Sequence, residues 1–276
     1  MIFRCCAVGL VWTVSAATAP AESLPLWEAG IGAAIVDFPD YRGANERHTY
    51  AQPFPYLEYR GEFLKADRER VRGVLFARPG TELNLSINGT TPVNSADNQA
   101  RAGMPYLDLT LEVGPNLEVN VWRGANGHKL DLRLPLRAVI ATNFRHAQDA
   151  GWVFQPQLNA DFRNLGSDGG WQLGVAAGPL FATRRNHQYF YRVESQFATS
   201  ARPTYDASGG YSGTQFIAAL SKRFPEFWIG AFARYDRLNG AAFVDSPLVK
   251  SREAFSAGLA VSWIFARSRE WVEAEK

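Results

Sequence analysis

Aromatic residues stand ten positions apart on one face of an alternating apolar and polar pattern, and this happens three times. The pairs are Trp152 and Phe162, Trp171 and Phe181, and Phe255 and Phe265. Between the members of each pair, alternate positions are apolar, while Gln, Asn, Asp, Gly or Ser fill most of the others. Ten strand steps rise about 33 Å, and a tilt of about 40° reduces this to about 25 Å, the height of the apolar band on an outer-membrane barrel. The spacing therefore predicts membrane-crossing strands whose rims carry these six residues as aromatic girdles.

The first 21 residues are typical of a secretory signal. A positive residue, Arg4, precedes an apolar stretch, and small residues follow up to position 21. Both cysteines, Cys5 and Cys6, lie in this segment. We therefore expect a mature chain without a disulfide or a lipid anchor, as suits a bacterial envelope protein.

Beyond this signal the sequence contains no run of 18 apolar residues, so a closed barrel is the remaining way to cross a bilayer. Soluble sandwiches and lipocalin-like barrels also alternate, but the aromatic spacing, the strand number and the small residues on the non-apolar face favour the membrane. We predict an all-β fold, a single closed antiparallel transmembrane β-barrel of about 12 strands (range about 10 to 14) over residues 22–265, and a short charged tail at 266–276. The formal net charge of +2 gives no electrostatic case for nucleic acid.

Turn-forming residues divide the strands. Residues 52–65 indicate two strands joined by a tight turn at 60–62, Gly114-Pro115-Asn116 indicates the turn of another hairpin, and residues 189–193 indicate a further strand. Glycine-rich and polar stretches at 37–50, 88–104, 146–151 and 203–213 are expected to be extracellular loops. Three prolines fall inside proposed strands and must lie at bulges or strand ends: Pro135, Pro156 and Pro179.

The non-apolar face of the proposed strands carries charges of both signs. These predicted luminal residues are Glu28, Glu82, Asp108, Glu112, Glu118, Asp131, Arg133, Arg137, Asp161, Arg234 and Asp236. They either line a channel or neutralise one another in a plugged interior. The plugged interior is favoured for a barrel of this size, because side chains fill much of its lumen.

Catalytic and metal-binding patterns are weak. The four histidines, His48, His128, His146 and His187, show no metal-ligand spacing, and His146 with Asp149 is the nearest thing to a catalytic dyad. Solvated loop residues explain them better. We predict no catalytic residue, no metal site, no cofactor and no enzymatic activity.

The C-terminal part carries two characteristic blocks, ARYDRLNGAAF at 233–243 and DSPLV at 245–249. With Gly30, Gly32 and the prolines near position 54, these blocks resemble the MltA-interacting protein (MipA)/OmpV family over nearly the whole mature chain. The motif residues are Tyr235, Asp236, Gly240, Asp245, Ser246, Pro247 and Leu248. They suit a turn that fixes the last hairpin, because Asx and Ser side chains bond nearby backbone and Gly accepts positive φ; a partner-binding surface is the alternative.

The resemblance implies a Gram-negative outer-membrane barrel embedded in lipid. In the best-known branch it implies a scaffold that joins a murein-cleaving lytic transglycosylase to a bifunctional penicillin-binding murein synthase, with contacts at the periplasmic rim. The alternatives are a porin-like channel, a surface adhesin or osmotic-response barrel and, less favoured, a lipid-modifying enzyme that would need His146 or His187. The chain departs from the family's terminal aromatic, because residues 266–276, including Trp271, follow Phe265.

Overall fold

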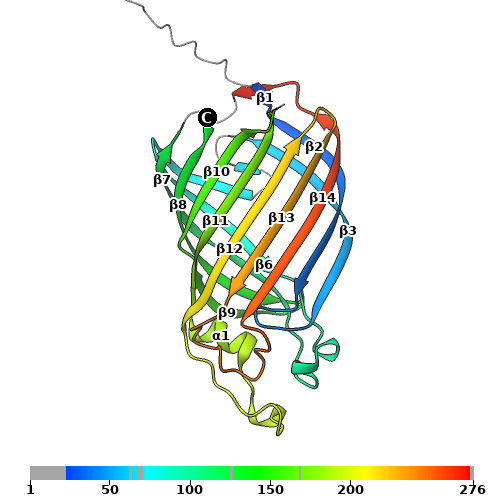
Figure 1. Cartoon of the computed structure of the whole chain (residues 1–276), viewed down its shortest axis with the longest axis vertical. Helices are drawn as coiled ribbons and strands as arrows, with labels where there is room; N and C mark the ends of the chain where they lie inside the picture. The colour runs from blue at the N-terminus through cyan, green and yellow to red at the C-terminus, as the bar shows by residue number, and fades with distance from the viewer. Residues whose placement is uncertain (1–22, 62–63, 67–70, 125–126, 168, 274–276) are drawn as a thin grey trace, which may run out of the picture.

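The chain forms one closed antiparallel β-barrel with loops gathered at one end (Figure 1). This computed structural model describes residues 23–61, 64–66, 71–124, 127–167 and 169–273; the predicted signal segment lies outside them. The wall strands are β2 Trp27–Pro39, β3 Arg47–Arg60, β4 Leu64–Ala66, β5 Val71–Arg78, β6 Thr81–Thr90, β7 Leu109–Arg123, β8 Lys129–Thr142, β9 Ala147–Phe154, β10 Gln157–Leu165, β11 Trp171–Ala182, β12 Gly210–Arg223, β13 Phe227–Arg237 and β14 Glu253–Arg267.

The first and last long strands close the wall, because β2 pairs with β14 over most of their length. Strands β9 and β10 are two halves of one strand, since β8 and β11 each pair with both halves. With these halves counted together, the described sheet has twelve strands. The prediction of an all-β antiparallel barrel of this size is confirmed.

The three strand prolines meet at one seam in the wall. Pro156 lies in the break between β9 and β10, and Pro135 of β8 faces this break, where its carbonyl accepts from the Gln155 N–H at 3.2 Å. Pro179 of β11 lies at a register shift. A Cβ on the neighbouring Gly178 would lie 2.0 Å from the Pro156 carbonyl oxygen, so only glycine allows the close approach there. Pro156 and Pro179 thus lie at a strand break and at a register shift, as predicted, whereas Pro135 lies inside β8, opposite the break in its partner strand.

Three sequence-based assignments are wrong. Residues 146–151, expected to be an extracellular loop, lie mostly in strand β9, and the connection there is 143–146. Gly114-Pro115-Asn116 is no turn, because β7 runs through it as one strand. The apolar residues before and after this segment keep the same alternating phase, and a Cβ on Gly114 would lie 2.0 Å from the Leu136 carbonyl oxygen. The glycine therefore serves close packing inside a strand.

The third error concerns residues 189–193, for which the sequence predicts a strand. They belong mainly to an α-helix, α1 (Arg184–Tyr191), and Val193 makes only an isolated bridge to Tyr205. Their aromatic character reflects packing in the loops. Neither α1 nor any other helix in the described part of the chain is long and apolar enough to span a bilayer.

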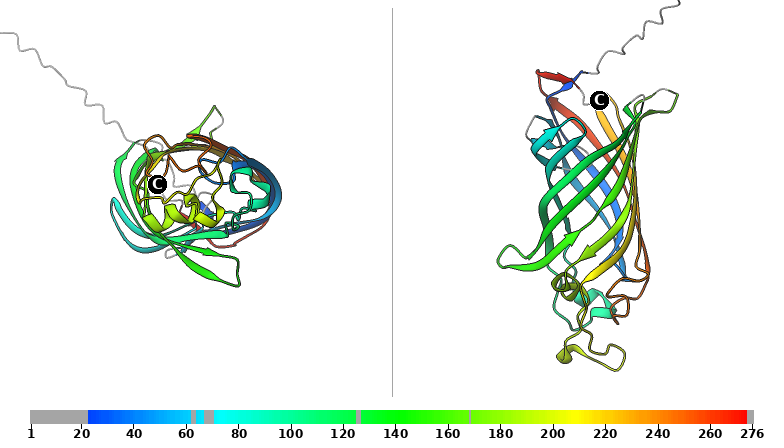
Figure 2. Two further views of the ribbon diagram at one scale, coloured as in Figure 1. Left: turned by 90° about the horizontal axis from the view of Figure 1, so that it is seen from below. Right: turned by 90° about the vertical axis from the view of Figure 1, so that its left-hand side faces the viewer.

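The two ends of the barrel differ. At one end, β1 (Ser23–Pro25) pairs with β15 (Trp271–Glu273), so both ends of the described chain meet there (Figure 1). The tail thus contains a short strand, and β14 extends two residues beyond Phe265. At the other end lie the connections 40–46, 91–108, 143–146, 183–209 and 238–252, with α1 and the 3-10 turns η1 (Ser95–Asp97), η2 (Gln99–Arg101) and η4 (Ser195–Phe197) (Figure 2).

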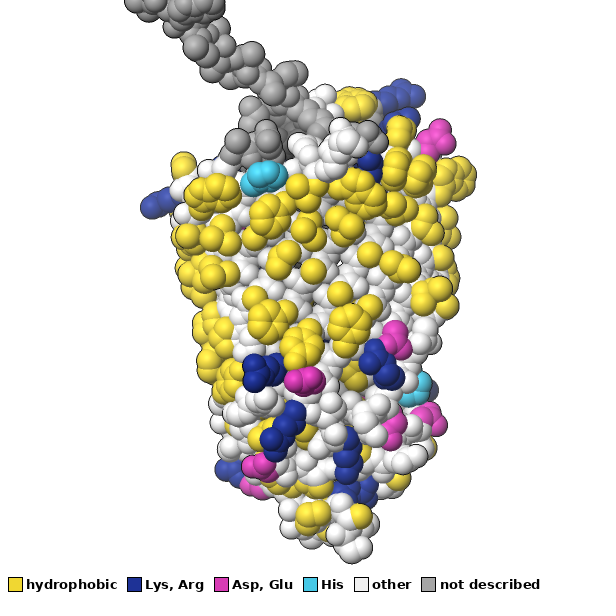
Figure 3. Space-filling view, in the orientation of Figure 1, with side chains coloured by type: hydrophobic (Ala, Val, Ile, Leu, Met, Phe, Trp, Pro, Cys, Tyr) yellow, Lys and Arg dark blue, Asp and Glu magenta, His cyan; other side chains and the backbone are white. Residues whose placement is uncertain are grey.

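The outer wall is apolar. Ile31, Leu158, Leu259 and Trp263 point outward with their side chains exposed, and apolar side chains form a broad band above a charged end (Figure 3). Inward positions hold small or polar residues such as Ser256 and Ser262, which are buried. This inside-out pattern is the one expected of a barrel whose outer face meets hydrocarbon.

Candidate functional site

Charged side chains on the inner face of the barrel are paired with one another. Among the predicted luminal residues, these are buried: Glu28, Glu118, Asp131, Arg133, Arg137, Asp161 and Asp236. A buried charge is stable only when it is paired and hydrogen-bonded, so the lumen has to be described by its ion pairs.

Near the end that holds β1 and β15, Glu28 lies between two arginines. Arg60 Nη2 and Arg223 Nε each donate to Glu28 Oε2 at 3.0 Å. Arg60 also pairs with Glu58 at 2.7 Å. Since Glu28 has no solvent exposure, the two guanidinium groups replace its water, and the cluster ties β2, β3 and β12 together.

Strands β7, β8 and β10 hold a second cluster. Lys129 Nζ lies 3.0 Å from Asp131 Oδ2 and 3.3 Å from Asp161 Oδ2. Arg133 Nε lies 3.4 Å from Glu118 Oε2. The mixed charges therefore neutralise one another, which is the second of the two arrangements considered from the sequence.

A chain of hydrogen bonds follows the inner wall toward the loops. Arg137 donates to Glu112 and to Gln155, both at 2.8 Å, and Gln155 Nε2 donates to Gln215 Oε1 at 2.9 Å. Gly178 of β11 pairs with Gln215 in register and has no side chain to separate the two glutamines. Small residues on β11 thus allow side chains from β9–β10 and β12 to meet.

Asp236, a motif residue, ends this chain. Its side chain is fully buried and accepts from Gln215 at 3.0 Å and from Arg42 at 2.9 Å. Arg234 Nε lies 3.0 Å from its other carboxylate oxygen. Because Arg42 belongs to the β2–β3 connection, Asp236 joins the luminal network to the loops.

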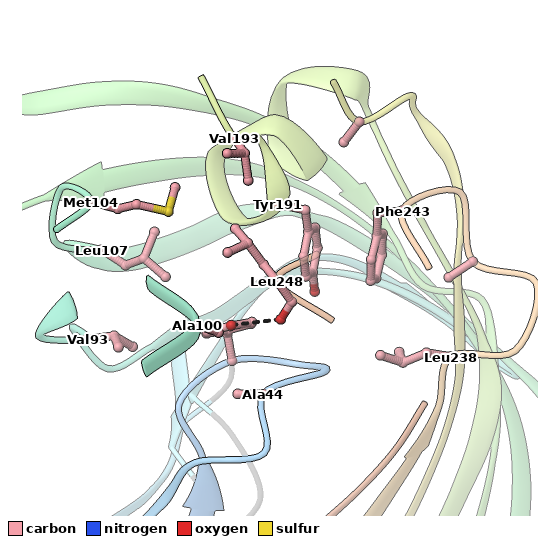
Figure 4. Close-up of a cluster of buried hydrophobic side chains, with 13 residues drawn as sticks. Ala44, Val93, Ala100, Met104, Leu107, Tyr191, Val193, Leu238, Phe243 and Leu248 are labelled. Carbon is pink, nitrogen blue, oxygen red and sulfur yellow. Dashed lines mark hydrogen bonds between the residues drawn. The ribbon is translucent and has the colours of Figure 1, made fainter. Parts of the chain in front are cut away.

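The loops form a second, apolar core, which we call the loop cap (residues 40–46, 91–108, 183–209 and 238–252). At its centre, the Tyr191 and Phe243 rings stack at 3.7 Å (Figure 4). His187 contacts Phe243 edge-on at 4.8 Å. The buried members are Tyr41, Ala44, Val93, Ala100, Met104, Leu107, Tyr191, Val193, Ala207, Leu238, Ala241, Phe243 and Leu248. Four connections far apart in the sequence thus close this end of the barrel.

Hydrogen bonds fix the cap around the motif. Tyr41 Oη donates to the Leu248 carbonyl, Tyr191 Oη donates to the Arg42 carbonyl, and Ser246 Oγ donates to the Tyr191 carbonyl, each at 2.8 Å. The Leu248 N–H in turn donates to Ser246 Oγ at 3.2 Å. These bonds connect the last loop to the first loop and to α1.

The motif residues therefore divide by burial. Asp236, Ser246 and Leu248 are buried, Tyr235 and Pro247 are half-buried, and Gly240 and Asp245 are exposed. Gly240 has a φ of 77°, the left-handed conformation expected of it. The block spans the end of β13 and much of the 15-residue connection between β13 and β14, a longer link than the tight turn considered from the sequence.

Burial changes the acidity of the cap side chains. It raises the pKa of Tyr189 to about 12, and it raises the pKa values of Tyr41 and Tyr191 as well. Burial also lowers the pKa of His187, an effect that the Ser208 carbonyl opposes and the Arg42 charge reinforces. The tyrosines and the histidine are thus neutral members of a packed core at pH 7.

His187 takes part in the one histidine–serine contact among the described residues. Its Nδ1 lies 2.6 Å from the Ser208 carbonyl oxygen, and its Nε2 lies 2.6 Å from Ser212 Oγ. Both side chains are almost fully buried, so this contact holds α1 against β12. Sequence reasoning named His187 but missed Ser212, which lies 25 positions away.

His146 and Asp149 are not brought together. Asp149 accepts from the Gly151 N–H at 2.7 Å and pairs with Arg185, while His146 is exposed. His48 instead pairs with Asp40 at 2.6 Å, and His128 Nδ1 accepts from the Arg163 N–H at 3.1 Å. Within the described ranges, no three His, Cys, Asp or Glu side chains are grouped to hold a metal ion.

The six aromatic residues at ten-residue spacing lie at opposite ends of their strands. Phe255 and Phe265 on β14 are half or more exposed, and the other four keep part of their rings exposed on the same outer surface: Trp152, Phe162, Trp171 and Phe181. Their role as girdles stays a prediction.

These features, an apolar outer wall around a paired polar lumen, define an outer-membrane β-barrel. The chain belongs to the family described as MltA-interacting protein MipA, whose model matches residues 31–265. It is 23% identical over 217 residues to the outer membrane protein Omp26La of Vibrio anguillarum, covering 75% of this chain and 76% of that protein. The protein is therefore located in the outer membrane of a Gram-negative bacterium.

Two solved structures resemble the chain more distantly. A bacterial polysaccharide outer membrane secretin aligns with a TM-score of 0.42 and 10% identity, over 87% of this chain and 99% of that one. An outer membrane channel of Pseudomonas putida F1 aligns with a TM-score of 0.43 and 12% identity, over 93% and 100%.

Proposed function

We propose that this barrel is a non-enzymatic adaptor that anchors murein enzymes to the outer membrane and conducts no steady current. The observation that carries the proposal is the loop cap, whose apolar core closes one end of the barrel. A closed end and a neutralised lumen suit a protein that acts through its rim. The family takes its name from an interaction with MltA, a lytic transglycosylase.

The connection lengths support an orientation for this adaptor. Outer-membrane barrels have short periplasmic turns and longer extracellular loops. The turns at the end that holds β1 and β15 span 61–63, 79–80, 124–128, 166–170 and 224–226, whereas the cap connections reach 27 residues at 183–209. The end with the short turns is therefore the periplasmic rim in our proposal, and it faces the murein layer.

The rim offers a rigid, exposed surface for a partner. The Glu28 cluster fixes its inner side, and Glu226, Arg269 and Trp271 are exposed on or beside it. We propose that a lytic transglycosylase binds there, and that a bifunctional penicillin-binding protein joins through the same assembly.

Site-specific photocrosslinking in intact envelopes tests this proposal. A photoreactive amino acid at Glu226 or Arg269 should capture the transglycosylase, whereas the same group at the exposed cap residue Asp245 should not. Capture from the cap position, or of no murein enzyme from either rim position, contradicts the adaptor role.

A porin-like channel is the second candidate, because charged side chains line the lumen. Conductance of the purified barrel in planar bilayers separates the two functions. The adaptor should give no steady current, whereas a channel should give stable open steps in the wild-type protein.

A further inference from the structure

Strand β3 has a free edge in an otherwise paired wall. Among the described residues, positions 47–55 pair only with β2, because the short strand β4 pairs only with Tyr59 and Arg60. On the far side of this gap, positions 87–90 of β6 pair only with β7, since the β5–β6 ladder ends at Gly73 and Leu85. Nine strand residues extend about 30 Å, so the free edge covers much of the wall. The short β4–β5 hairpin lies toward the end that holds the termini (Figure 2).

Two prolines mark this edge in the sequence. The β2–β3 ladder runs without a register shift through the pairs Ala33–Pro53 and Ile31–Pro55. Because proline has no N–H, an unbroken ladder requires both ring nitrogens to point away from β2, toward the gap. Edge strands use proline in this way to prevent pairing with another strand. The sequence therefore keeps the edge open.

Side chains at the gap are exposed on both faces of the strands. Positions 49–53 of β3 and 87–90 of β6 are all exposed, although alternate residues point outward and inward. Elsewhere on β3, inward-facing Tyr56 is buried. The inner surface beside the gap is therefore accessible.

An apolar strip leads from this edge into the polar lumen. Tyr50 of β3 pairs in register with Val36 of β2, Val36 pairs with Gly258 of β14, and Gly258 pairs with Phe232 of β13. Tyr50 and Phe232 face inward yet are 38% and 37% exposed. The strip spans three strand spacings, about 14 Å.

Neighbouring aromatic side chains widen the strip. Phe38 stacks on Tyr50 at 5.2 Å. Phe54 lies over Gly32, where an added Cβ would come within 2.6 Å of its ring, and Phe232 covers Gly258 in the same way. Across the gap, the inward positions of β6 are polar: Ser86, Asn88 and Thr90. One side of the opening is thus apolar and the other can form hydrogen bonds.

We propose that the gap between β3 and β6 is a lateral portal, through which an amphiphile with one apolar chain enters from the membrane and lays that chain on the strip of Tyr50, Val36 and Phe232. The head group lies toward Ser86, Asn88 and Thr90. Unpaired backbone groups are tolerated at membrane depth only where they line a water-filled cavity. Water from the lumen therefore reaches the free edges of β3 and β6, at the border with the hydrocarbon of the membrane. The prolines argue against a strand of a partner as the occupant. This inference does not depend on the adaptor role.

Photolabelling tests the portal. The wild-type protein in lipid nanodiscs is illuminated with a lysophosphatidylcholine that carries a diazirine in its acyl chain, and the adducts are mapped by mass spectrometry. We expect adducts on inward-facing Tyr50, Phe54 and Phe232 as well as on the outer wall. Adducts confined to outward-facing side chains overturn the proposal, and this map needs no variant.

Variants sharpen the result. Replacement of both strip aromatics (Tyr50→Ser with Phe232→Ser) should reduce the remaining luminal adducts, at Phe54, about tenfold, the effect of roughly 1.4 kcal/mol of lost apolar contact. The matched control, Leu57→Ser with Leu259→Ser, alters two outward-facing residues and should leave the luminal adducts unchanged. Heat-modifiable migration on gels verifies that each barrel is folded. An equal reduction in both variants overturns the strip as the binding surface.

A cysteine at the edge tests the competing occupant. Ala51 is exposed on the free portion of β3, and Ala51→Cys would form disulfide-linked dimers if a second copy paired there. The portal predicts monomers under mild oxidation in native membranes. Efficient dimer formation overturns it in favour of an interface between two copies.

Discussion

The lumen and the loop cap are two interiors of one chain, and they bury different kinds of side chain. The lumen buries charged groups such as Glu28, Asp131 and Arg137, while the cap buries Leu238, Phe243 and Leu248. The difference follows from what lies outside each region. Lipid covers the apolar outer wall of the barrel, so its interior can be polar, whereas the cap lies beyond the apolar band and has to bury its own apolar side chains.

An ion pair is one of the contacts that join the two interiors. Asp236 on the wall and Arg42 on the first loop are joined at 2.9 Å, and the Tyr191 hydroxyl donates to the Arg42 carbonyl. The hydrogen-bond network of the lumen is thus connected, through Arg42, to the hydrogen bonds of the apolar cap. Substitutions on either side of this junction should have separable effects.

The largest effect is expected from opening the apolar core. Phe243→Ala removes a ring that is 1% exposed and stacked on Tyr191, and it should lower the local unfolding free energy of the cap by about 3–5 kcal/mol. Hydrogen exchange of the protein in nanodiscs measures this at the amides of α1. The β14 amides should keep their protection, because lipid and the strand ladder hold the barrel.

Phe144→Ala is the matched control, since this aromatic is 88% exposed at the tip of the β8–β9 hairpin. It should change cap exchange by less than about 0.5 kcal/mol. Faster exchange throughout β14 in Phe243→Ala would show that the cap and the barrel form one cooperative unit.

Local patterns account for what the sequence predicts correctly. An outward residue on a membrane strand is apolar whatever its neighbours are, so alternation near Phe255 and Trp171 identifies β14 and β11 without knowledge of the partner strands. The ionic interior follows from the opposite face by the same logic. Gly114 misled because glycine with proline usually marks a turn, whereas here it permits close contact with Leu136 of a neighbouring strand.

The cap could not be predicted in this way. Its four segments are far apart in the sequence and share no period, so nothing local indicates that Tyr41, Tyr191 and Phe243 meet. The aromatic run at 189–191 was the available signal, and in isolation it resembles a strand. The free edge of β3 is the intermediate case, because Pro53 and Pro55 mark it but only the register shows which side they face.

A smaller effect is expected at the junction. Asp236→Asn leaves Arg42 and Arg234 without their carboxylate and should cost about 2–3 kcal/mol, less than for a fully buried pair because both arginines are partly exposed. Urea unfolding of the cap, followed by proteolysis of its loops, measures this loss.

Asp245→Asn is the control within the same motif, because Asp245 is exposed. It should change stability by less than about 0.5 kcal/mol. If Asp245→Asn instead abolished capture of a partner in envelopes while stability stayed constant, the exposed part of the motif would be a binding surface. Equal destabilisation by both variants would contradict the division of the motif by burial.

The smallest effect is a pH dependence confined to the cap. Burial holds the pKa of His187 below its ordinary value of 6.5, which the opened cap regains. At pH 7.5 both states are neutral at this site, so the stability is fully present. As the pH falls below 6.5, His187 becomes protonated in the open cap but stays neutral in the closed cap. The stability of the closed cap therefore decreases with falling pH, until the pH reaches the lower pKa of His187 in the folded state. Hydrogen exchange at pH 7.5, 6.5 and 5.5 should show this loss in α1. The His187→Gln cap should be less stable, and its stability should depend less on pH. An identical slope in both proteins would show that His187 is not the source of the pH dependence.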